Sequence, residues 1–391
     1  MEKKYLNFGL VIFLVAANMR ISIIMLSPIL TKVAAALNLS SAVMGSLTSI
    51  PLLCFALLSI FVAPLGNILG SKRSLNLALG LIIVASLFRV YSPTLLILGT
   101  LLCGIGITFL NVLIPAAILE WKPKEALKLN GLYTASNSFF CALTGGVASP
   151  LAQMLGWKLT LQLSAIPAVL AMVLWNLYVT KNQPSQSEPV QKSSQLQNFV
   201  LVLKRPEIWL LALYMGLQSV AFYALTTWLP TVISAAGFSA NQAGLLFAFF
   251  QIVGFPVSYI AASFLKSKQR YYGVTVALIF CFTLGSLLLV YLPNFVGVVL
   301  ACIALGFGVA CTFTISMSLI SILSKERNET NLISGMVQTI GYLLASLGPT
   351  LFGYFKTNAG WNHSLWFLTI TMLIWGLIGL ILGRFINWQK H

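Results

Sequence analysis

The chain is poor in acidic side chains. Its 391 residues contain seven glutamates, no aspartate and two histidines, and only 8% of the residues are charged. Soluble globular proteins carry about 25% charged residues, so this composition excludes a soluble domain. The six cysteines lie within apolar stretches and form no CxxC pair, which favours small core residues over a metal or redox site. No GxxxxGK(S/T) loop is present, which argues against an ATP-driven pump. We therefore expect no cofactor, no metal and no enzymatic activity.

Long apolar stretches make up most of the sequence, in which 59% of residues are hydrophobic. Stretches of about 20 residues fit the bilayer as helices, and the alternating ten-residue strands of a membrane barrel are missing. We predict an all-α integral membrane protein with twelve transmembrane helices. The first helix is expected to be retained, because no small-residue cleavage site follows it. The twelve stretches are roughly 6–31, 43–66, 74–92, 94–119, 129–153, 157–180, 207–234, 241–265, 272–292, 294–323, 331–355 and 362–386.

The basic residues are placed unevenly along this topology. With a cytoplasmic N-terminus, 18 of the 23 Lys and Arg residues fall in inner loops, and only Lys32, Lys158 and Lys356 fall outside. Such a bias follows the positive-inside rule and predicts a multi-pass protein of the plasma (inner) membrane with both termini cytoplasmic. The net charge of +16 therefore serves topology, and we expect no nucleic-acid partner; the partners are the lipid bilayer and a small-molecule solute.

Weak repeats indicate two related halves. Three pairs of features recur in the same order: Gly156-Trp157 with Gly360-Trp361, Gly104-x-Gly106 with Gly306-x-Gly308, and Pro28 with Pro230. The Ser/Gln/Pro-rich segment 181–205 between the halves is typical of a flexible linker. We predict an N-terminal six-helix bundle (1–180), a cytoplasmic linker (181–205) and a C-terminal six-helix bundle (206–391). This layout resembles that of major-facilitator transporters, whose solute binds between the halves near the membrane midplane.

The segment between the second and third stretches resembles the major-facilitator signature G-x-L-x-D-r-x-G-r-k. It runs from Ala63 to Arg73 as APLGNILGSKR, with Ala63 in place of the glycine and Asn67 in place of the aspartate. In the family the aspartate forms an ion pair, which asparagine cannot make. The resemblance implies a conformational loop that includes Gly66, Asn67, Gly70, Lys72 and Arg73.

A narrower resemblance covers nearly the whole chain. The runs that carry it are Asn18-Met19-Arg20 with Pro28, Asn111-Val112-Leu113-Ile114-Pro115, Gly131-Leu132-Tyr133-Thr134, Met215-Gly216-Leu217-Gln218-Ser219, Phe222-Tyr223 and Trp228-Leu229-Pro230. They are similar to the cyanate/2-nitroimidazole porter branch of the major facilitator superfamily. The resemblance implies transport of a small polar or anionic solute, and we expect a monomer.

Arg20 is the first candidate for the site. It lies near the middle of the first stretch, whereas the predicted topology puts every glutamate in or beside a cytoplasmic loop. A guanidinium stays charged at any relevant pH, and placing it in a bilayer costs at least about 2.5–3.5 kcal/mol. We therefore expect Arg20 to bind an anionic or strongly dipolar solute. The alternative is a structural arginine that binds helix carbonyls.

Other polar and aromatic residues within the stretches are further candidates for solute contact. On the seventh stretch, the repeat mate of the first, a polar patch is expected to face Arg20 across the pseudo-axis: Gln218, Ser219, Phe222 and Tyr223. Asn111, Tyr133 and Asn137 are either helix–helix hydrogen bonds or cavity lining, Asn18 has the same two interpretations, and Gln251 and Gln338 lie at intermediate depth. Trp228 is expected either to line the outer mouth or to be an interfacial anchor. Arg89 is expected to reach the outer membrane interface, with attraction of anions to the outer vestibule as the alternative.

These residues predict a secondary-active or facilitative transporter that works by alternating access. Proton-coupled porters commonly use carboxylates within the membrane, and here only Glu120 and Glu207 come close, at the cytoplasmic edge. Facilitated diffusion, exchange, and coupling through a proton on the solute or on an edge glutamate all stay open; uniport or exchange is favoured. The alternatives are a drug-efflux porter of the same fold and, less favoured, a receptor or lipid-modifying enzyme.

Overall fold

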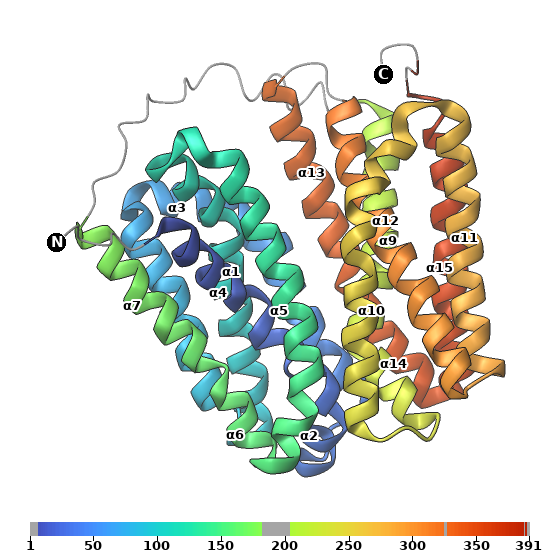
Figure 1. The fold of residues 1–391 in the computed structure, drawn as a ribbon, viewed down its shortest axis with the longest axis horizontal. Helices are drawn as coiled ribbons and strands as arrows, with labels where there is room; N and C mark the ends of the chain where they lie inside the picture. Colours follow the sequence, from blue (N-terminus) through green and yellow to red (C-terminus); the bar gives the residue numbers. More distant parts are fainter. Residues whose placement is uncertain (1–6, 182–203, 324–326, 387, 389–391) are drawn as a thin grey trace. The chain divides into compact units, whose positions relative to one another are not determined.

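The computed structural model describes residues 7–181, 204–323, 327–386 and 388, and the elements within these ranges are helices (Figure 1). The first six predicted segments form α1 (Phe8–Ile24), α2 (Leu30–Leu37), α3 (Ser41–Phe88), α4 (Pro93–Trp121), α5 (Ala126–Met154), α6 (Gly156–Leu163) and α7 (Ala165–Lys181). The last six form α9 (Pro206–Ala235), α10 (Ala240–Ala261), α11 (Lys268–Tyr291), α12 (Phe295–Leu323), α13 (Arg327–Ala345), α14 (Leu347–Ala359) and α15 (Trp361–Leu382). Most of the predicted linker, residues 182–203, lies outside the described residues.

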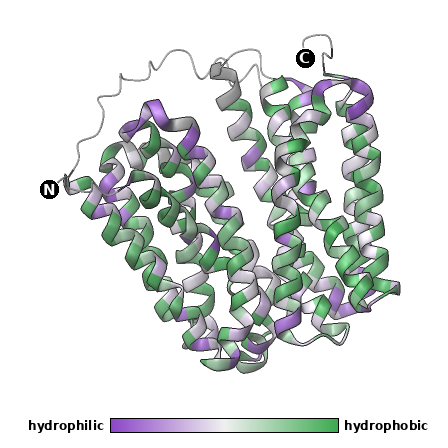
Figure 2. Ribbon diagram, viewed as in Figure 1, coloured by the Kyte–Doolittle hydropathy of each residue, from purple (hydrophilic) through white to green (hydrophobic). Residues whose placement is uncertain are grey.

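The helices have the length and composition of membrane spans. Within the described ranges, ten stretches are long and apolar enough to cross a bilayer, and Figure 2 shows hydrophobic residues along most of their length. The two other predicted segments are α5 and α10. In α10 the apolar part is shorter, Ala240–Gly254, and the helix passes into the 3-10 helix Ala262–Lys266. In α5 the length is sufficient, but polar side chains run through the first half. The all-α membrane fold is confirmed, and α5 is one of its more polar helices.

Three predicted segments are broken at prolines. The first is interrupted by the 3-10 helix Ser27–Ile29, which contains Pro28. In the other two, α6 meets α7 at Ser164, three residues before Pro167, and α13 meets α14 at Ser346, three residues before Pro349. Proline has no N–H, so the carbonyl four residues earlier loses its helical partner. At both serine breaks the hydroxyl donates to the carbonyl three residues earlier, at 2.6 Å, which supports a local bend.

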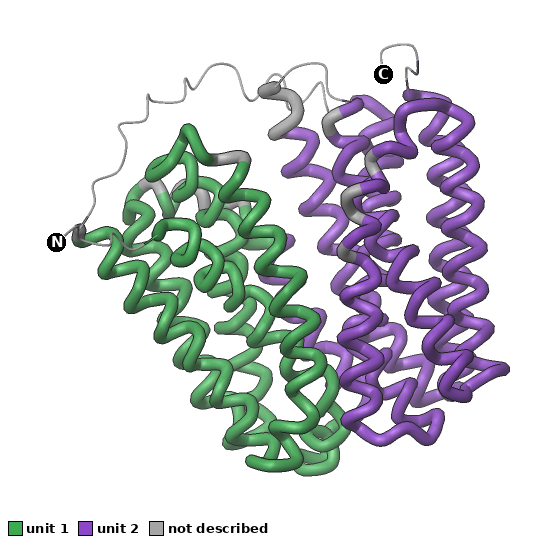
Figure 3. The backbone as a smooth tube through the Cα atoms, viewed as in Figure 1, with its two compact units in different colours: residues 1–39, 57–190 green, residues 40–56, 191–391 purple. Residues whose placement is uncertain are grey.

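The chain divides into two compact units, residues 1–39 with 57–190 and residues 40–56 with 191–391 (Figure 3). Within the first unit α1 packs against α4, α5 and α7; within the second, α9 packs against α12, α13, α14 and α15. Because the sequence repeat pairs α1 with α9, these corresponding neighbours are what two related six-helix bundles require. The predicted domain boundaries stay a prediction.

The first part of α3 packs within the second unit. Ser49 Oγ and Thr350 Oγ1 lie 2.9 Å apart, and a side chain at Gly45 would overlap the carbonyl of Pro349. A glycine is therefore needed for α3 to approach α14 this closely. By sequence these residues belong to the first six segments, so the compact units and the sequence halves differ at this helix.

Candidate functional site

Arg20 is the only charged residue of α1. It lies twelve residues after Phe8, the first residue of the helix, which corresponds to about 18 Å along the axis. The adjacent Met19 and Ile21 are buried, whereas Arg20 is half-buried. The structure therefore leaves part of a permanently charged side chain accessible, deep within a membrane-length segment.

The polar helix α5 packs directly on α1. Ser136 Oγ of α5 donates to the carbonyl of Phe13 in α1, at 2.6 Å. Three residues before Ser136, Tyr133 Oη donates to Asn111 Oδ1 of α4 at 3.0 Å. Directly after Ser136, Asn137 has a buried Oδ1 without a hydrogen-bond partner. The structure thus brings Asn111 and Tyr133 together, as helix–helix contact, and leaves an acceptor available on Asn137.

Asn18 makes helix–helix hydrogen bonds, one of the two roles predicted for it. It is fully buried, and its Nδ2 donates to the carbonyl of Leu14 at 2.8 Å and to that of Pro167 in α7 at 3.4 Å. These bonds tie α1 to the proline-broken segment α6–α7. Asn18 therefore supports the helix that carries Arg20. Its Oδ1 is buried without a hydrogen-bond partner, as is that of Asn137, and a contact of Asn18 with solute stays a prediction.

Gln218 is buried in the middle of α9, with 1% of its surface exposed. Its Nε2 lies 2.7 Å from Ser219 Oγ and 3.2 Å from Met215 Sδ, and its Oε1 has no hydrogen-bond partner. If the amide were turned over, Ser219 would donate to the oxygen and the nitrogen would be left without a good acceptor. Either orientation leaves one buried amide atom of Gln218 without a good hydrogen-bond partner.

An aromatic group forms around the same helix. The rings of Phe222 and Tyr223 meet edge to face at 4.8 Å, and Tyr223 lies 6.3 Å from Tyr342 of α13. Tyr342 in turn meets Phe55 of α3 at 4.4 Å. Sequence reasoning missed Phe55 and Tyr342. Tyr342 was detectable, because it is four residues from the candidate Gln338 and shares its helix face.

The remaining candidates in the second unit differ in their surroundings. Gln338 is half-buried and its Nε2 donates to Ser334 Oγ of the preceding turn at 2.7 Å. Gln251 of α10 is also half-buried. Trp228 corrects the sequence prediction: it is fully buried and its Nε1 donates to the carbonyl of Pro349 at 2.8 Å. Trp228 therefore packs α9 against α14 and does not line the outer mouth.

Arg89 is the largest departure from the sequence prediction. It was expected to reach the membrane interface, yet it is 2% exposed. Its Nη1 donates to the carbonyl of Ser22 at 2.8 Å and its Nη2 to Ser164 Oγ at 3.3 Å. The sequence did not show that the end of α3, where Arg89 lies, packs against the ends of α1 and α6.

The signature segment, residues 63–73, is helical on both sides of Gly70 and is not an open loop. The helix α3 runs through it from both sides, but Gly70 has φ 77° and ψ 157°, a conformation that favours glycine. Trp121 Nε1 donates to Ser71 Oγ at 3.2 Å, and Trp175 Nε1 lies 3.4 Å from the carbonyl of Lys72. Two tryptophans, from α4 and α7, thus hold the turn. Their role was not predicted from the sequence.

The other residues of the signature follow the same pattern. Gly66 lies against Leu113, so that a side chain there would come within 2.5 Å of Leu113 Cδ2. Lys72 and Arg73 are exposed. The side chain of Asn67 lies outside what the structure describes. The conformational role of the segment stays a prediction.

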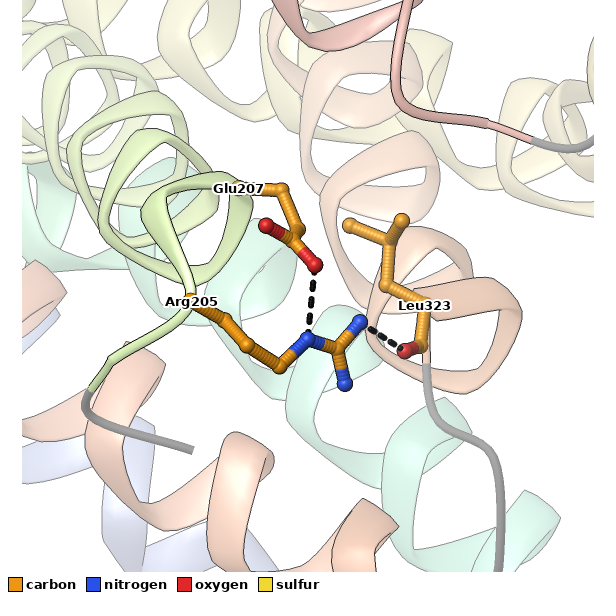
Figure 4. A network of polar contacts seen from close by, with 3 residues as sticks. All are labelled: Arg205, Glu207 and Leu323. Atoms are coloured by element: carbon orange, nitrogen blue, oxygen red, sulfur yellow. Dashed lines mark hydrogen bonds and ion pairs between the residues drawn. The ribbon is translucent and has the colours of Figure 1, made fainter. Parts of the chain in front are cut away.

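The edge carboxylate Glu207 is held by a neighbour. Arg205 Nε donates to Glu207 Oε1 at 2.6 Å, and Arg205 Nη2 donates to the carbonyl of Leu323 at 3.0 Å (Figure 4). Leu323 is the last residue of α12, so Arg205 joins the start of α9 to the end of α12. Glu207 therefore takes part in a structural ion pair at the start of α9.

The sequence and the fold match those of known proteins. The sequence model of the Major Facilitator Superfamily matches residues 9–349. The chain is 30% identical over 376 residues to the 2-nitroimidazole transporter of Escherichia coli (strain K12), covering 95% of this chain and 94% of the relative. It is 25% identical over 354 residues to the cyanate transport protein CynX of the same strain, covering 90% of each.

One solved structure shows the same fold. It is that of a bacterial homolog to the human lysosomal transporter Spinster, in an inward-facing and unoccupied conformation. It matches with a TM-score of 0.84 at 14% identity and covers 99% of this chain and 98% of that chain. At this identity the likeness speaks for the fold alone.

Proposed function

Because the chain belongs to the Major Facilitator Superfamily and is a multi-pass membrane transporter, we propose that it carries a small anionic or polar solute by alternating access, with Arg20 as the anion-binding group. The observation that carries this proposal is a permanent charge on α1 that stays half-accessible inside a membrane-length segment. A protein retains such a costly charge where it acts on a ligand.

The shape of the guanidinium fits the proposed solute class. Its planar fork presents N–H donors in pairs, which match two oxygens of one group. A nitro group offers two such oxygens, and a linear cyanate ion offers charged ends to the same donors. One arginine can therefore serve both of the solutes for which the relatives are named. Asn137, in the same unit as Arg20, has a neutral acceptor without a hydrogen-bond partner that could contact the rest of the solute. A solute contact for Gln218 stays a prediction.

The proposals for energy coupling and for orientation in the membrane rest on where the charged residues lie. In the part of the chain that the structure describes, Glu120 and Glu207 lie at the ends of α4 and α9, and Glu207 is paired with Arg205. We propose facilitated diffusion or exchange rather than a carboxylate relay. The distribution of Lys and Arg supports cytoplasmic termini in the plasma membrane.

Uptake into proteoliposomes tests the function. Cyanate, nitrite, 2-nitroimidazole and a lipophilic cationic dye would be supplied separately to wild type, Arg20→Gln and the exposed-arginine control Arg270→Gln. We expect uptake of at least one small anion or azole by wild type and the control, and its loss in Arg20→Gln. Dye transport that persists in Arg20→Gln, with no uptake of the small solutes by wild type, would contradict the proposal.

That last result would favour a drug-efflux porter. One observation supports this second candidate: the aromatic group of Phe55, Phe222, Tyr223 and Tyr342. Aromatic faces bind flat lipophilic cations as well as azoles. The dye arm of the experiment separates the two functions.

A further inference from the structure

Three helix C-termini of the first unit converge on Arg89. The residue directly follows Phe88, the last residue of α3. Its guanidinium donates to Ser22, two residues before the end of α1, and to Ser164, which caps the C-terminus of α6. Each helix C-terminus carries roughly half a negative elementary charge. These partial charges favour the buried guanidinium, which among the described residues has no ion pair and whose Nε has no hydrogen-bond partner.

The bond to Ser22 completes the broken end of α1. The amide of Leu26 bonds to the carbonyl of Ile23, three residues earlier, at 3.2 Å. Pro28, with no N–H, leaves the carbonyl of Ile24 without its usual helical partner. Arg89 Nη1 takes up the carbonyl of Ser22 in this irregular turn, at 2.8 Å. Arg20 lies two residues before Ser22, in the same final turn of α1.

The bond to Ser164 holds the second break. Ser164 Oγ donates to the carbonyl of Leu161 and lies 2.9 Å from Ser86 Oγ of α3. The nearby Pro167 receives the bond from Asn18 of α1. The breaks in α1 and in α6–α7 are therefore connected twice, once through Arg89 and once through Asn18.

Close packing fixes Arg89 from the third side. A side chain added at Gly99 of α4 would come within 2.5 Å of Arg89 Cβ and 3.2 Å of the carbonyl of Ala85. The glycine lets α4 pack closely against the backbone and Cβ of Arg89, which fixes the point from which its side chain extends.

We propose that Arg89 is a positioning residue for solute binding: by holding Ser22 and Ser164 it fixes the two helix breaks and thereby sets the position of Arg20. The inference rests on the proposed function, in which Arg20 binds the solute. A purely structural Arg89 would instead support folding and leave the position of residue 20 and the apparent KM unchanged once the protein has folded.

The test combines transport with a reading of position 20 that needs no solute. First, KM and Vmax for the transported anion would be measured in Arg89→Met, Arg89→Lys, Ser164→Ala and the control Arg270→Met. Second, Arg20→Cys, in a background with the six native cysteines replaced, would be labelled by the neutral reagent methyl methanethiosulfonate with each of these changes. Monodisperse elution and a measured unfolding temperature qualify each protein for the comparison.

Loss of a charged hydrogen bond is expected to raise KM in Arg89→Met by about 10- to 100-fold, with Vmax changed little and a labelling rate at position 20 that differs clearly from that of the parent. Arg89→Lys keeps the charge but cannot hold both partners, and Ser164→Ala removes one of them, so both should show smaller changes in the same direction. Arg270→Met should match the parent.

Wild-type KM and labelling in a folded Arg89→Met protein would overturn the proposal. If Arg89→Met does not fold, unchanged KM and labelling in both Arg89→Lys and Ser164→Ala would overturn it. A changed KM with unchanged labelling would also overturn it, because Arg89 would then act other than through position 20. If labelling changes while Arg20→Gln transports normally, Arg89 still positions residue 20, and it is the proposed function that fails.

Discussion

α1 and α9 occupy corresponding places in the two units but carry different polar chemistry. Each packs at the centre of its own unit against corresponding neighbours. α1 carries the half-buried, permanently charged Arg20, whereas α9 carries the neutral Gln218, which is 1% exposed. The repeat has preserved the packing of the helix and not its polar group.

The physical chemistry of burial explains this difference. A neutral amide atom without a partner costs about 1–3 kcal/mol when buried, a cost that a folded helix bundle can sustain. A charge withdrawn completely needs compensation, as Arg89 receives from three helix ends. Arg20 stays partly accessible, which suits a group that meets an anion, while Gln218 suits a weaker, neutral contact.

Placing a charge on α9 at position 218 should have the largest effect on stability. Gln218→Arg would place a guanidinium at a fully enclosed position, at a cost of several kcal/mol, so we expect loss of folded protein in detergent. Arg20→Gln should unfold within a few degrees of wild type. Size-exclusion profiles and thermal unfolding measure both. A Gln218→Arg protein as stable as wild type would show that position 218 is as accessible as position 20. That result would contradict the difference drawn between α1 and α9.

Removing the amide of Gln218 should act on transport more than on stability. Gln218→Met keeps the volume and removes the buried atom that lacks a partner, so the unfolding temperature should be unchanged or raised. If the amide contacts the solute, KM should rise by about 2- to 12-fold, the equivalent of one neutral hydrogen bond. Initial uptake rates decide this. A wild-type KM would make Gln218 a packing residue.

The bond between α4 and α5 should have a moderate effect. Tyr133→Phe removes the donor to Asn111 Oδ1 and is expected to destabilise the protein by about 0.5–1.5 kcal/mol. Thermal unfolding, with Tyr354→Phe as an exposed-tyrosine control, measures the loss. A matching loss in both variants would assign no special role to this bond.

The edge carboxylate should matter least. Arg205 and Glu207 are partly exposed, with side-chain exposures of 20% and 17%, and such pairs contribute about 0–1 kcal/mol. Glu207→Gln should therefore transport within about fivefold of wild type, with or without a pH gradient. Abolition of gradient-driven accumulation by this change alone would instead identify Glu207 as a coupling group.

The sequence sufficed for what depends on local pattern. Apolar length predicts the helices, and repeated glycines and prolines predict the pairing of α1 with α9. The breaks near prolines 28, 167 and 349 were not predicted, because Pro115, Pro150, Pro230 and Pro256 lie inside helices that continue through them. The continuity of α3 was less predictable, since Gly70 interrupts the helix at a single residue.

The features that could not be predicted from the sequence depend on tertiary contacts. Arg89 looks like an interfacial residue four positions before Pro93, and only the meeting of three helix ends explains its burial. Trp121 looks like a membrane anchor, yet it bonds to the turn after Gly70. Phe55 is one aromatic residue in an apolar run until Tyr342 is placed against it. The roles of the site residues in solute binding stay predictions.

The most direct test of the central claim is the KM for uptake of the transported anion in Arg20→Lys and Arg20→Gln, measured side by side in proteoliposomes. A charge-assisted bond contributes about 1.5–3 kcal/mol, so Arg20→Gln should raise KM by about 10- to 150-fold, with Arg20→Lys in between because it keeps the charge and loses the fork. Equal KM values in wild type, Arg20→Lys and Arg20→Gln would contradict the account.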